Sequence, residues 1–200
     1  MSLKDTATVL AYHQDRIARF GVDTTEALGW KCLQSQQQRF SALAGLGDFS
    51  GRSVLDIGCG HGDFYPFIAH EHPSVEYIGL DNDRSFLEVA VTRFGSVRNT
   101  SFLAGEFATV KLPRADFVIC CGALNYRSSD AGYLENMIGR FFAVCNLGLG
   151  LNLLSHVDFE AGILTPYDPE TVAEFCLELT PNVELVAGPE QDHFTLFLRR

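Results

Sequence analysis

The sequence has little of what a nucleic-acid-binding protein needs. It carries 15 Lys and Arg against 25 Asp and Glu, a formal net charge of −10, and its one adjacent basic pair is Arg199-Arg200. Proteins that hold phosphates along a duplex need a cationic surface. The charge therefore disfavours nucleic acid and anionic membranes as partners, and leaves open a local basic patch formed by folding.

Long apolar runs and metal-ligand patterns are also absent. No stretch has the length of a signal peptide or a membrane span, and the run at 147–154 is short and contains Gly and Asn. The six Cys include no CxxC pair, and the six His lack zinc-site spacing. We expect reduced thiols, no metal centre, no membrane association and a cytoplasmic location.

Enough apolar residues are present for a packed core. They make up 46% of the chain, with 16 Phe, and 200 residues fit one domain with a short extension. We expect a helical extension over residues 1–50 and a main domain over 51–200.

The hydropathy pattern predicts an α/β fold. Helices are expected at 4–20, 31–46, 63–72, 84–94, 133–144 and 169–179, and strands at 53–57, 75–80, 100–104, 116–121, 147–154, 183–186 and 194–198. The two N-terminal helices carry apolar stripes, formed by Val9, Leu10, Ile17 and Phe20 and by Leu33, Phe40 and Leu43. Alternating strands and helices indicate a mainly parallel sheet covered on both faces, and the last two strands should pair antiparallel.

The strongest motif is a buried strand that runs into a glycine-rich turn and a helix, at Val54–Phe64. Glycines let a backbone approach a ligand, and the following helix offers free N–H groups. A nicotinamide fingerprint would need Gly where Asp63 stands, and the Gly-Lys-Ser/Thr of a phosphate loop is absent. Acidic Asp56 and Asp63 on either side of the glycines suit a cationic or amine-bearing ligand.

Four segments in order resemble class I S-adenosylmethionine-dependent methyltransferases. They are Leu55–Gly62, Tyr77–Asp81, Ala104–Phe107 and Ala115–Gly122. The resemblance implies a three-layer α/β/α, Rossmann-like, doubly wound sheet of seven strands in the order 3-2-1-4-5-7-6, with the last strand antiparallel. It also implies S-adenosyl-L-methionine as the cofactor.

The same resemblance implies a set of cofactor-binding residues. These are Asp56, Gly58, Cys59, Gly60, Asp81, Asn82, Glu106, Phe107 and Cys121. Asp81 would accept hydrogen bonds from the ribose hydroxyls, or would instead cap the helix at 84–94. Glu106 would lie near the adenine amino group, or would be a solvated loop carboxylate.

Candidate acceptor-facing residues follow two later strands. Asn125 and Tyr126 come after the fourth strand, and either orients an acceptor or serves a turn and packing. His156 follows the fifth strand, where it acts as a general base or is an ordinary loop residue. Trp30 and Arg39 would belong to a lid made by the N-terminal extension, with Trp30 as a hydrophobic plug or part of the cavity wall.

These features predict an enzyme, a transferase that moves a methyl group from S-adenosylmethionine to a small-molecule acceptor. The alternative is a non-catalytic regulatory or partner-binding domain that holds S-adenosylmethionine or S-adenosylhomocysteine. A nicotinamide-dependent oxidoreductase is disfavoured by the missing third glycine. The acceptor and the oligomeric state stay open.

Overall fold

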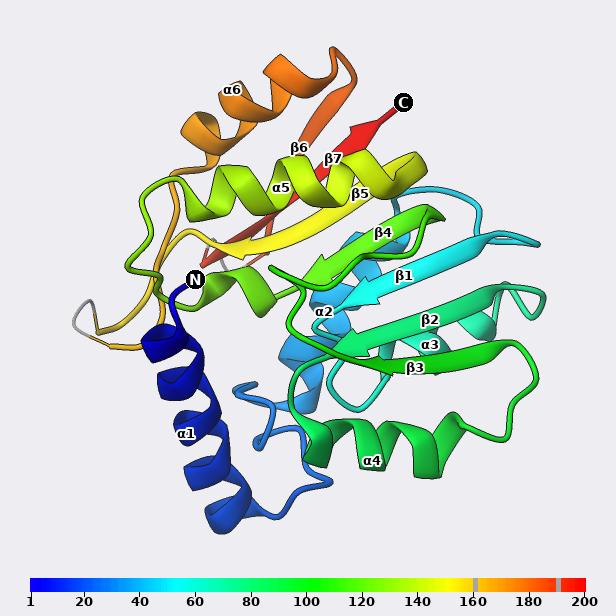
Figure 1. Cartoon of the computed structure of the whole chain (residues 1–200). Coiled ribbons are helices and arrows are strands. Elements are labelled where there is room, and N and C mark those ends of the chain that lie inside the picture. Colours follow the sequence, from blue (N-terminus) through cyan, green and yellow to red (C-terminus); the bar gives the residue numbers. More distant parts are fainter. Residues whose placement is uncertain (160–161, 190–191) are drawn as a thin grey trace.

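The computed structural model describes residues 1–159, 162–189 and 192–200. Its centre is a seven-stranded sheet in the order β3-β2-β1-β4-β5-β7-β6 (Figure 1). The strands are β1 Ser53–Ile57, β2 Glu76–Asp81, β3 Thr100–Ala104, β4 Ala115–Cys121, β5 Cys145–Leu154, β6 Val183–Ala187 and β7 His193–Arg199. Strands β1 to β5 pair in parallel, and β7 runs antiparallel to both β5 and β6. The strand order and the antiparallel end of the sheet predicted from the sequence are confirmed.

Six α-helices and a short 3-10 turn, η1, surround the described part of the sheet. They are α1 Leu3–Phe20, α2 Leu33–Ala44, α3 Phe64–Ala69, α4 Arg84–Phe94, η1 Ala123–Asn125, α5 Tyr133–Val144 and α6 Pro169–Leu179. The predicted bounds of α4, α5 and α6 are confirmed. α3 ends at Ala69, before the predicted end at His72, and Pro73 follows directly. A residue that precedes proline is disfavoured in the α-helical region, so the chain leaves the helix early.

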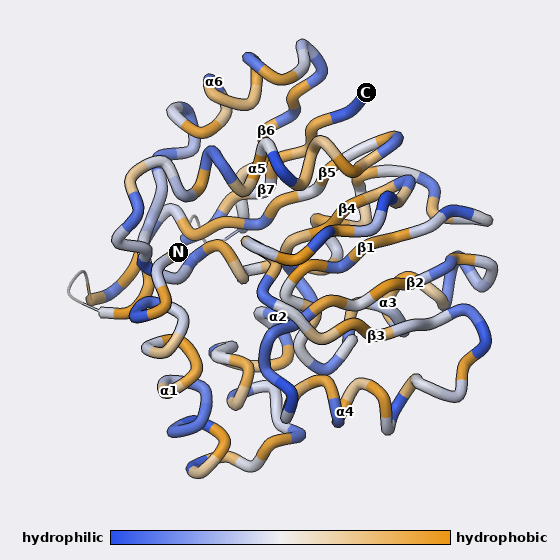
Figure 2. Tube along the Cα trace, viewed as in Figure 1, coloured by the Kyte–Doolittle hydropathy of each residue, from blue (hydrophilic) through white to orange (hydrophobic). Residues whose placement is uncertain are grey.

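The helices form two layers around the sheet. α5 packs against β4 and β5, and α6 packs against β6 and β7. α2 contacts β4, β5 and β7 together with α3, and two buried apolar clusters fill the spaces on the two faces. Figure 2 shows hydrophobic residues running along the central strands between these layers. No helix in the described ranges has the length and hydrophobicity needed to cross a membrane.

α2 belongs to the core although it lies within the first fifty residues. Phe40 and Leu43 are buried against β1 and β4, in the same cluster as Val54 and Phe117. Leu33, which the sequence pattern places on the same stripe, is exposed at the first residue of the helix. The apolar face of α2 therefore spans only its second half.

α1 lies at the carboxyl ends of the parallel strands, toward which the arrows of β1, β2 and β4 point (Figure 1). A capping box starts the helix, since the Ser2 hydroxyl accepts from the Asp5 N–H at 3.2 Å. The Asp5 carboxylate also accepts from the Ser129 N–H at 2.9 Å and from its hydroxyl at 2.8 Å. These bonds fix the first turn of α1 to the loop between β4 and α5.

The different burial of the two leucines in α2 gives a direct test of its place in the core. Leu43→Ala should lower the free energy of unfolding by about 2–5 kcal/mol, because it leaves a cavity between α2 and the sheet. Leu33→Ala, on the exposed start of the same helix, should change it by less than about 0.5 kcal/mol. Urea unfolding of both variants measures this. Equal, small effects would contradict the packing of α2 described above.

Candidate active site

The glycine-rich turn after β1 forms the floor of the site. Gly58 and Gly60 have positive φ angles of 72° and 54°, a region that side chains rarely tolerate. A Cβ on Gly58 would lie 2.3 Å from the Ala123 Cβ, and one on Gly60 would lie 2.7 Å from Leu28 Cδ2. The glycines therefore let η1 and the segment between α1 and α2 approach the turn closely, in addition to leaving its backbone accessible.

Asp81, the last residue of β2, joins two turns through its carboxylate. Oδ2 accepts from the Gly60 N–H at 2.8 Å, and Oδ1 accepts from the Asp83 N–H at 2.9 Å. The cap of α4 is Asp83, whose carboxylate accepts from the Ser85 N–H at 2.9 Å. The alternative role of Asp81 as the cap of this helix is therefore wrong. Burial raises the pKa of Asp81 to about 6, despite these hydrogen bonds.

Asp56 lies inside β1 and is the most strongly perturbed carboxylate in the site. The Tyr77 hydroxyl donates to its Oδ2 at 2.5 Å. Burial, helped by the nearby negative charge of Asp81, raises the pKa of Asp56 to about 7. Two carboxylates with raised pKa values on one side of a site disfavour an anionic ligand there and favour a cationic one.

The turn after β3 contributes a further acidic group. Glu106 accepts from the Asn82 amide at 3.0 Å and from the Thr6 hydroxyl of α1 at 3.5 Å. Glu106 is therefore held by the protein rather than simply solvated. Burial raises the pKa of the Cys121 thiol to about 12 and that of Cys59 well above its usual range, so both thiols stay protonated near neutral pH.

A cavity of about 220 Å³ brings these residues together. Every residue predicted to bind a cofactor lines it, namely Asp56, Gly58, Cys59, Gly60, Asp81, Asn82, Glu106, Phe107 and Cys121. Asn125 and Tyr126 line it as well. Their assigned roles remain predictions, but the fold places all of them on one cavity at the carboxyl ends of β1, β2 and β4.

Two predicted residues lie elsewhere. His156 is outside the residues that line this cavity, and its side chain is 70% exposed near Asp158. Its backbone N–H donates to the Asp192 carbonyl, which holds this loop at the edge of the sheet. Asp63 lines a different hollow, because its carboxylate accepts from Arg93 at 3.0 Å and from Gln36 at 3.2 Å. Asp63 thus links α2 and α4 and does not contribute to the acidic wall of the cavity.

The cavity lining also contains a buried cation. Arg39 of α2 lines the cavity and donates to Asn152 Oδ1 at 3.3 Å, with Asp192 at 3.9 Å. Its guanidinium lies 5.3 Å from the ring of Trp30, which also lines the cavity. Trp30 therefore belongs to the wall, as one of the two sequence interpretations proposed.

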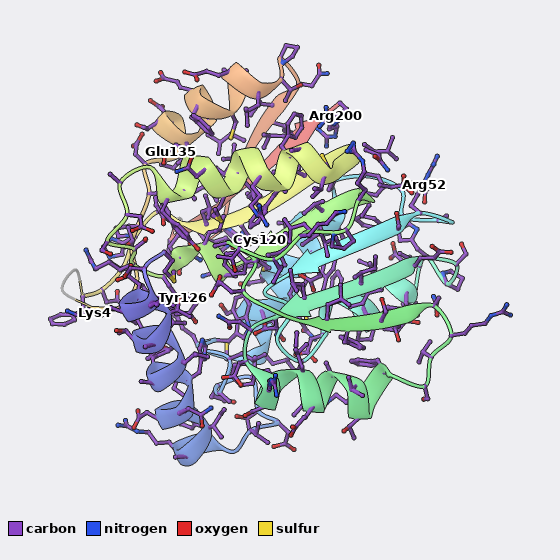
Figure 3. All side chains as sticks on the ribbon, viewed as in Figure 1. Lys4, Arg52, Cys120, Tyr126, Glu135 and Arg200 are labelled. Carbon is purple, nitrogen blue, oxygen red and sulfur yellow. The ribbon has the colours of Figure 1, made fainter. Side chains whose placement is uncertain are left out.

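The exit of β4 supplies the remaining polar groups. Asn125 is buried in η1, and its Oδ1 accepts from the Leu154 N–H at 2.9 Å, which ties the exit of β4 to the end of β5. The Tyr126 hydroxyl lies 2.8 Å from Nε2 of His13. Figure 3 shows Tyr126 beside α1, where the helix meets the strand ends.

His13 is the main functional candidate that the sequence analysis missed. It is buried and lines the cavity from α1, as Thr6 and Val9 do. A signal was present, because His13 lies four residues after Val9 and four before Ile17, on the apolar stripe of the helix. A histidine on the buried stripe of a helix points into whatever that helix covers.

Comparisons with known proteins agree with this geometry. Residues 54–147 match the sequence model of a family described as a methyltransferase domain. The demethylmenaquinone methyltransferase of Lactococcus lactis subsp. lactis is 30% identical over 82 residues, which are 40% of this chain and 32% of that protein. The chain thus spans about a third of the length of this curated relative.

Solved structures share the fold at low sequence identity. The pyocyanin biosynthetic protein PhzM superposes with a TM-score of 0.68 at 18% identity, over 92% of this chain and 63% of that one. A SAM-dependent methyltransferase from Aquifex aeolicus superposes with a TM-score of 0.61 at 18% identity, over 80% of this chain and 88% of that one. At this level of identity the similarity establishes the fold.

The raised pKa of Asp56 predicts a pH dependence of stability. Since the pKa is about 7 in the folded protein and 3.8 ordinarily, folding favours the protonated carboxyl. Its contribution is therefore complete below about pH 4 and is lost as the pH rises through about 7. Between about pH 5 and pH 8, wild-type protein should lose on the order of 2–4 kcal/mol more unfolding free energy than Asp56→Asn.

Urea unfolding at the two pH values measures this difference. His13 and His61, whose pKa values are lowered by burial, act in the opposite direction, but they are present in both proteins and cancel in the comparison. Parallel pH profiles for wild type and Asp56→Asn would show that Asp56 is ionised throughout this range.

Proposed function

We propose that this chain, whose residues 54–147 match the sequence model of a methyltransferase domain, binds S-adenosylmethionine and transfers the methyl group to a small-molecule acceptor. The observation that carries the proposal is the position of Asp81. Asp81 is the last residue of β2, and its carboxylate accepts from the Gly60 N–H in the glycine turn after β1. Asp81 and this turn line the same cavity. This is the switch region of a doubly wound sheet, where such folds bind ligands.

The cavity has the groups that each part of this cofactor requires. A carboxylate offers only acceptors, so Asp81 suits the two ribose hydroxyls. Asn82 and Glu106, joined to each other at 3.0 Å, suit the adenine amino group, and Phe107 supplies an apolar face. These residues lie along the ends of β2 and β3, so the nucleoside would occupy that side of the cavity.

The amino-acid end of the cofactor fits the rest of the wall. Its ammonium group suits the acidic side formed by Asp56, and its carboxylate suits the buried guanidinium of Arg39. The bound cofactor would supply a sulfonium methyl group as the electrophile. The protein's own task is then alignment and exclusion of water, and positioning alone contributes up to about 7–11 kcal/mol to such reactions.

The lid supports a reaction shielded from water. α1 contributes Val9 and His13 to the cavity, and the following segment contributes Leu28 and Trp30. A net charge of −10 argues for a small acceptor rather than a nucleic acid. We also propose a cytoplasmic location, on the strength of six cysteines that all lie in the described residues as free thiols.

Asp81 provides the sharpest binding test. Asp81→Ala should weaken binding of S-adenosylhomocysteine about 10²- to 10⁴-fold, since it removes the acceptor of two charge-assisted hydrogen bonds from the ribose hydroxyls, each of about 1.5–3 kcal/mol. Calorimetry measures the affinity, and circular dichroism checks the fold. Asp158→Ala, at an exposed carboxylate outside the cavity lining, is the matched control and should bind like wild type. Unchanged affinity in Asp81→Ala would remove the ribose assignment, and absence of binding by wild type would remove the proposed function.

Removal of the lid helix should open the cavity without unfolding the domain. The single Trp of the chain, Trp30, lines the cavity and reports on its exposure. Deletion of residues 1–20 should increase acrylamide quenching of Trp30 fluorescence, and S-adenosylhomocysteine should bind within about tenfold of wild type. Quenching that stays the same in the shortened, folded protein would place the lid elsewhere.

A further inference from the structure

His13 and Tyr126 form a directional hydrogen-bonded pair at the cavity. Nδ1 of His13 lies 3.0 Å from the Ala27 carbonyl oxygen, which only accepts. Nδ1 must therefore carry the ring proton, and Nε2 of the neutral ring is an acceptor. The Tyr126 hydroxyl, 2.8 Å from Nε2, then donates to it. The tautomer of His13 is thus set by the Ala27 carbonyl.

The surroundings keep this histidine neutral and ready to accept a proton. Burial lowers the pKa of His13 below its usual range, so the ring is uncharged near neutral pH. Of the charged groups around it, Asp83 at the start of α4 favours the protonated ring, and Arg16 of α1 opposes it. The edges of Phe86 and Tyr12 pack against the ring and limit its movement.

Tyr126 is held as firmly as its partner. Its backbone pairs with Leu164, and its ring packs against those of His13 and Tyr12. A Cβ on Gly29 would lie 3.6 Å from the Tyr126 hydroxyl, so Gly29 leaves space beside that oxygen. Both His13 and Tyr126 line the cavity that contains Asp56 and Asp81.

The carboxylates in the same cavity are already committed to protein donors. Asp56 accepts from Tyr77, and Asp81 accepts from two backbone N–H groups. Glu106 accepts from Asn82. The Nε2 lone pair of the neutral His13 ring instead points at the Tyr126 hydroxyl, which lines the cavity, and this geometry makes it the candidate proton acceptor.

We propose that Tyr126 and His13 form a proton relay that deprotonates an acceptor hydroxyl, and that the acceptor is a small alcohol or phenol. The acceptor oxygen gives its proton to Tyr126 Oη as Tyr126 passes its own proton to His13 Nε2. The oxygen keeps the electron pair that forms the new bond to the methyl carbon, and the sulfur keeps the pair of the broken bond. The protonated His13 returns the proton to solvent when the product leaves.

The relay rests on the proposed function and adds to it a substrate class and a role for the lid. His13 belongs to α1, whereas Tyr126 follows β4, so the pair exists only when the lid helix is docked. Closure would therefore bring the base to the acceptor at the same time as it excludes water. An acceptor that is already ionised would not need the pair.

The first test uses no catalysis. Long-range ¹H–¹⁵N NMR of the wild-type protein should show His13 as the Nδ1-protonated tautomer. Tyr126→Phe should shift the Nε2 resonance, because its hydrogen-bond donor is removed, whereas Tyr12→Phe should not. Tyr12 contacts both rings but contributes no hydrogen bond to the pair, so it is the matched control. An Nε2-protonated His13 would overturn the relay.

The second test separates proton removal from structural support. Release of S-adenosylhomocysteine is measured with phenol and naphthol, which are protonated near neutral pH, and with pentafluorophenol, which is ionised. Tyr126→Phe and His13→Gln should lose about 10²- to 10⁴-fold of kcat/KM with the protonated probes and keep most of it with the ionised one. Tyr12→Phe should behave like wild type with both.

Each other result counts against the relay. Equal losses with protonated and ionised probes would assign the two residues to structure alone, and unchanged rates would remove them from the reaction. Calorimetry with S-adenosylhomocysteine on the same samples distinguishes failure of the relay from failure of the proposed function. Wild-type protein that binds the cofactor product but methylates no hydroxyl probe would overturn the relay and leave the cofactor site standing, whereas absence of binding would overturn the proposed function.

Discussion

The hydrogen bonds from the Gly60 and Asp83 N–H groups to the Asp81 carboxylate hold the site together. They join the turn after β1 to the turn after β2, where the two parallel strands end side by side. Parallel strands leave their carboxyl ends at one edge, where the backbone groups of the turns have no ladder partners. Asp81 satisfies two of these groups at once, and this fixes the glycine turn in a shape that leaves room for other segments.

The approach of α1 and the segment after it to the cavity depends on that shape. Gly60 leaves space for Leu28, and Gly58 leaves space for Ala123, so the segment after α1 and the exit of β4 both meet the turn closely. His13 and Tyr126 reach each other only because these two segments converge on the same edge of the sheet. The position of the His13–Tyr126 pair therefore depends on the shape of the glycine turn. The hydrogen bonds of Asp81 described above do not include either residue of the pair.

The cavity combines groups that are unfavourable to bury. Burial raises the pKa values of Asp56 and Asp81 and lowers that of His13. Each shift disfavours the charged form of its group, and a cationic ligand near the carboxylates would reverse part of this penalty. Burial in the fold therefore favours a positively charged ligand near Asp56 and Asp81, and it keeps the His13 ring neutral.

The hydropathy pattern was sufficient to predict most of the architecture. The bounds of α4, α5 and α6 follow from apolar periodicity, and strand–helix alternation predicts a parallel sheet because parallel neighbours need crossover helices. The order of the strands came from the family resemblance rather than from the pattern. α3 was predicted too long, since periodicity continued past the point where Pro73 disfavours the helix.

The sequence by itself determined which strand ends Asp56, the glycines, Asp81 and Glu106 occupy, because they lie in short segments with a strong local pattern, and the family resemblance grouped them as one proposed cofactor site. Only the tertiary structure decided which other residues share their cavity. The sequence pattern places Asp63 beside the glycines as it does Asp56, but Arg93 and Gln36 hold Asp63 in another hollow. His156, which the sequence pattern singles out after a strand, is outside the cavity lining, whereas His13, which it does not single out, lines the cavity. His13 and Tyr126 are 113 residues apart, and no local pattern encodes the docking of α1 that brings them within 2.8 Å.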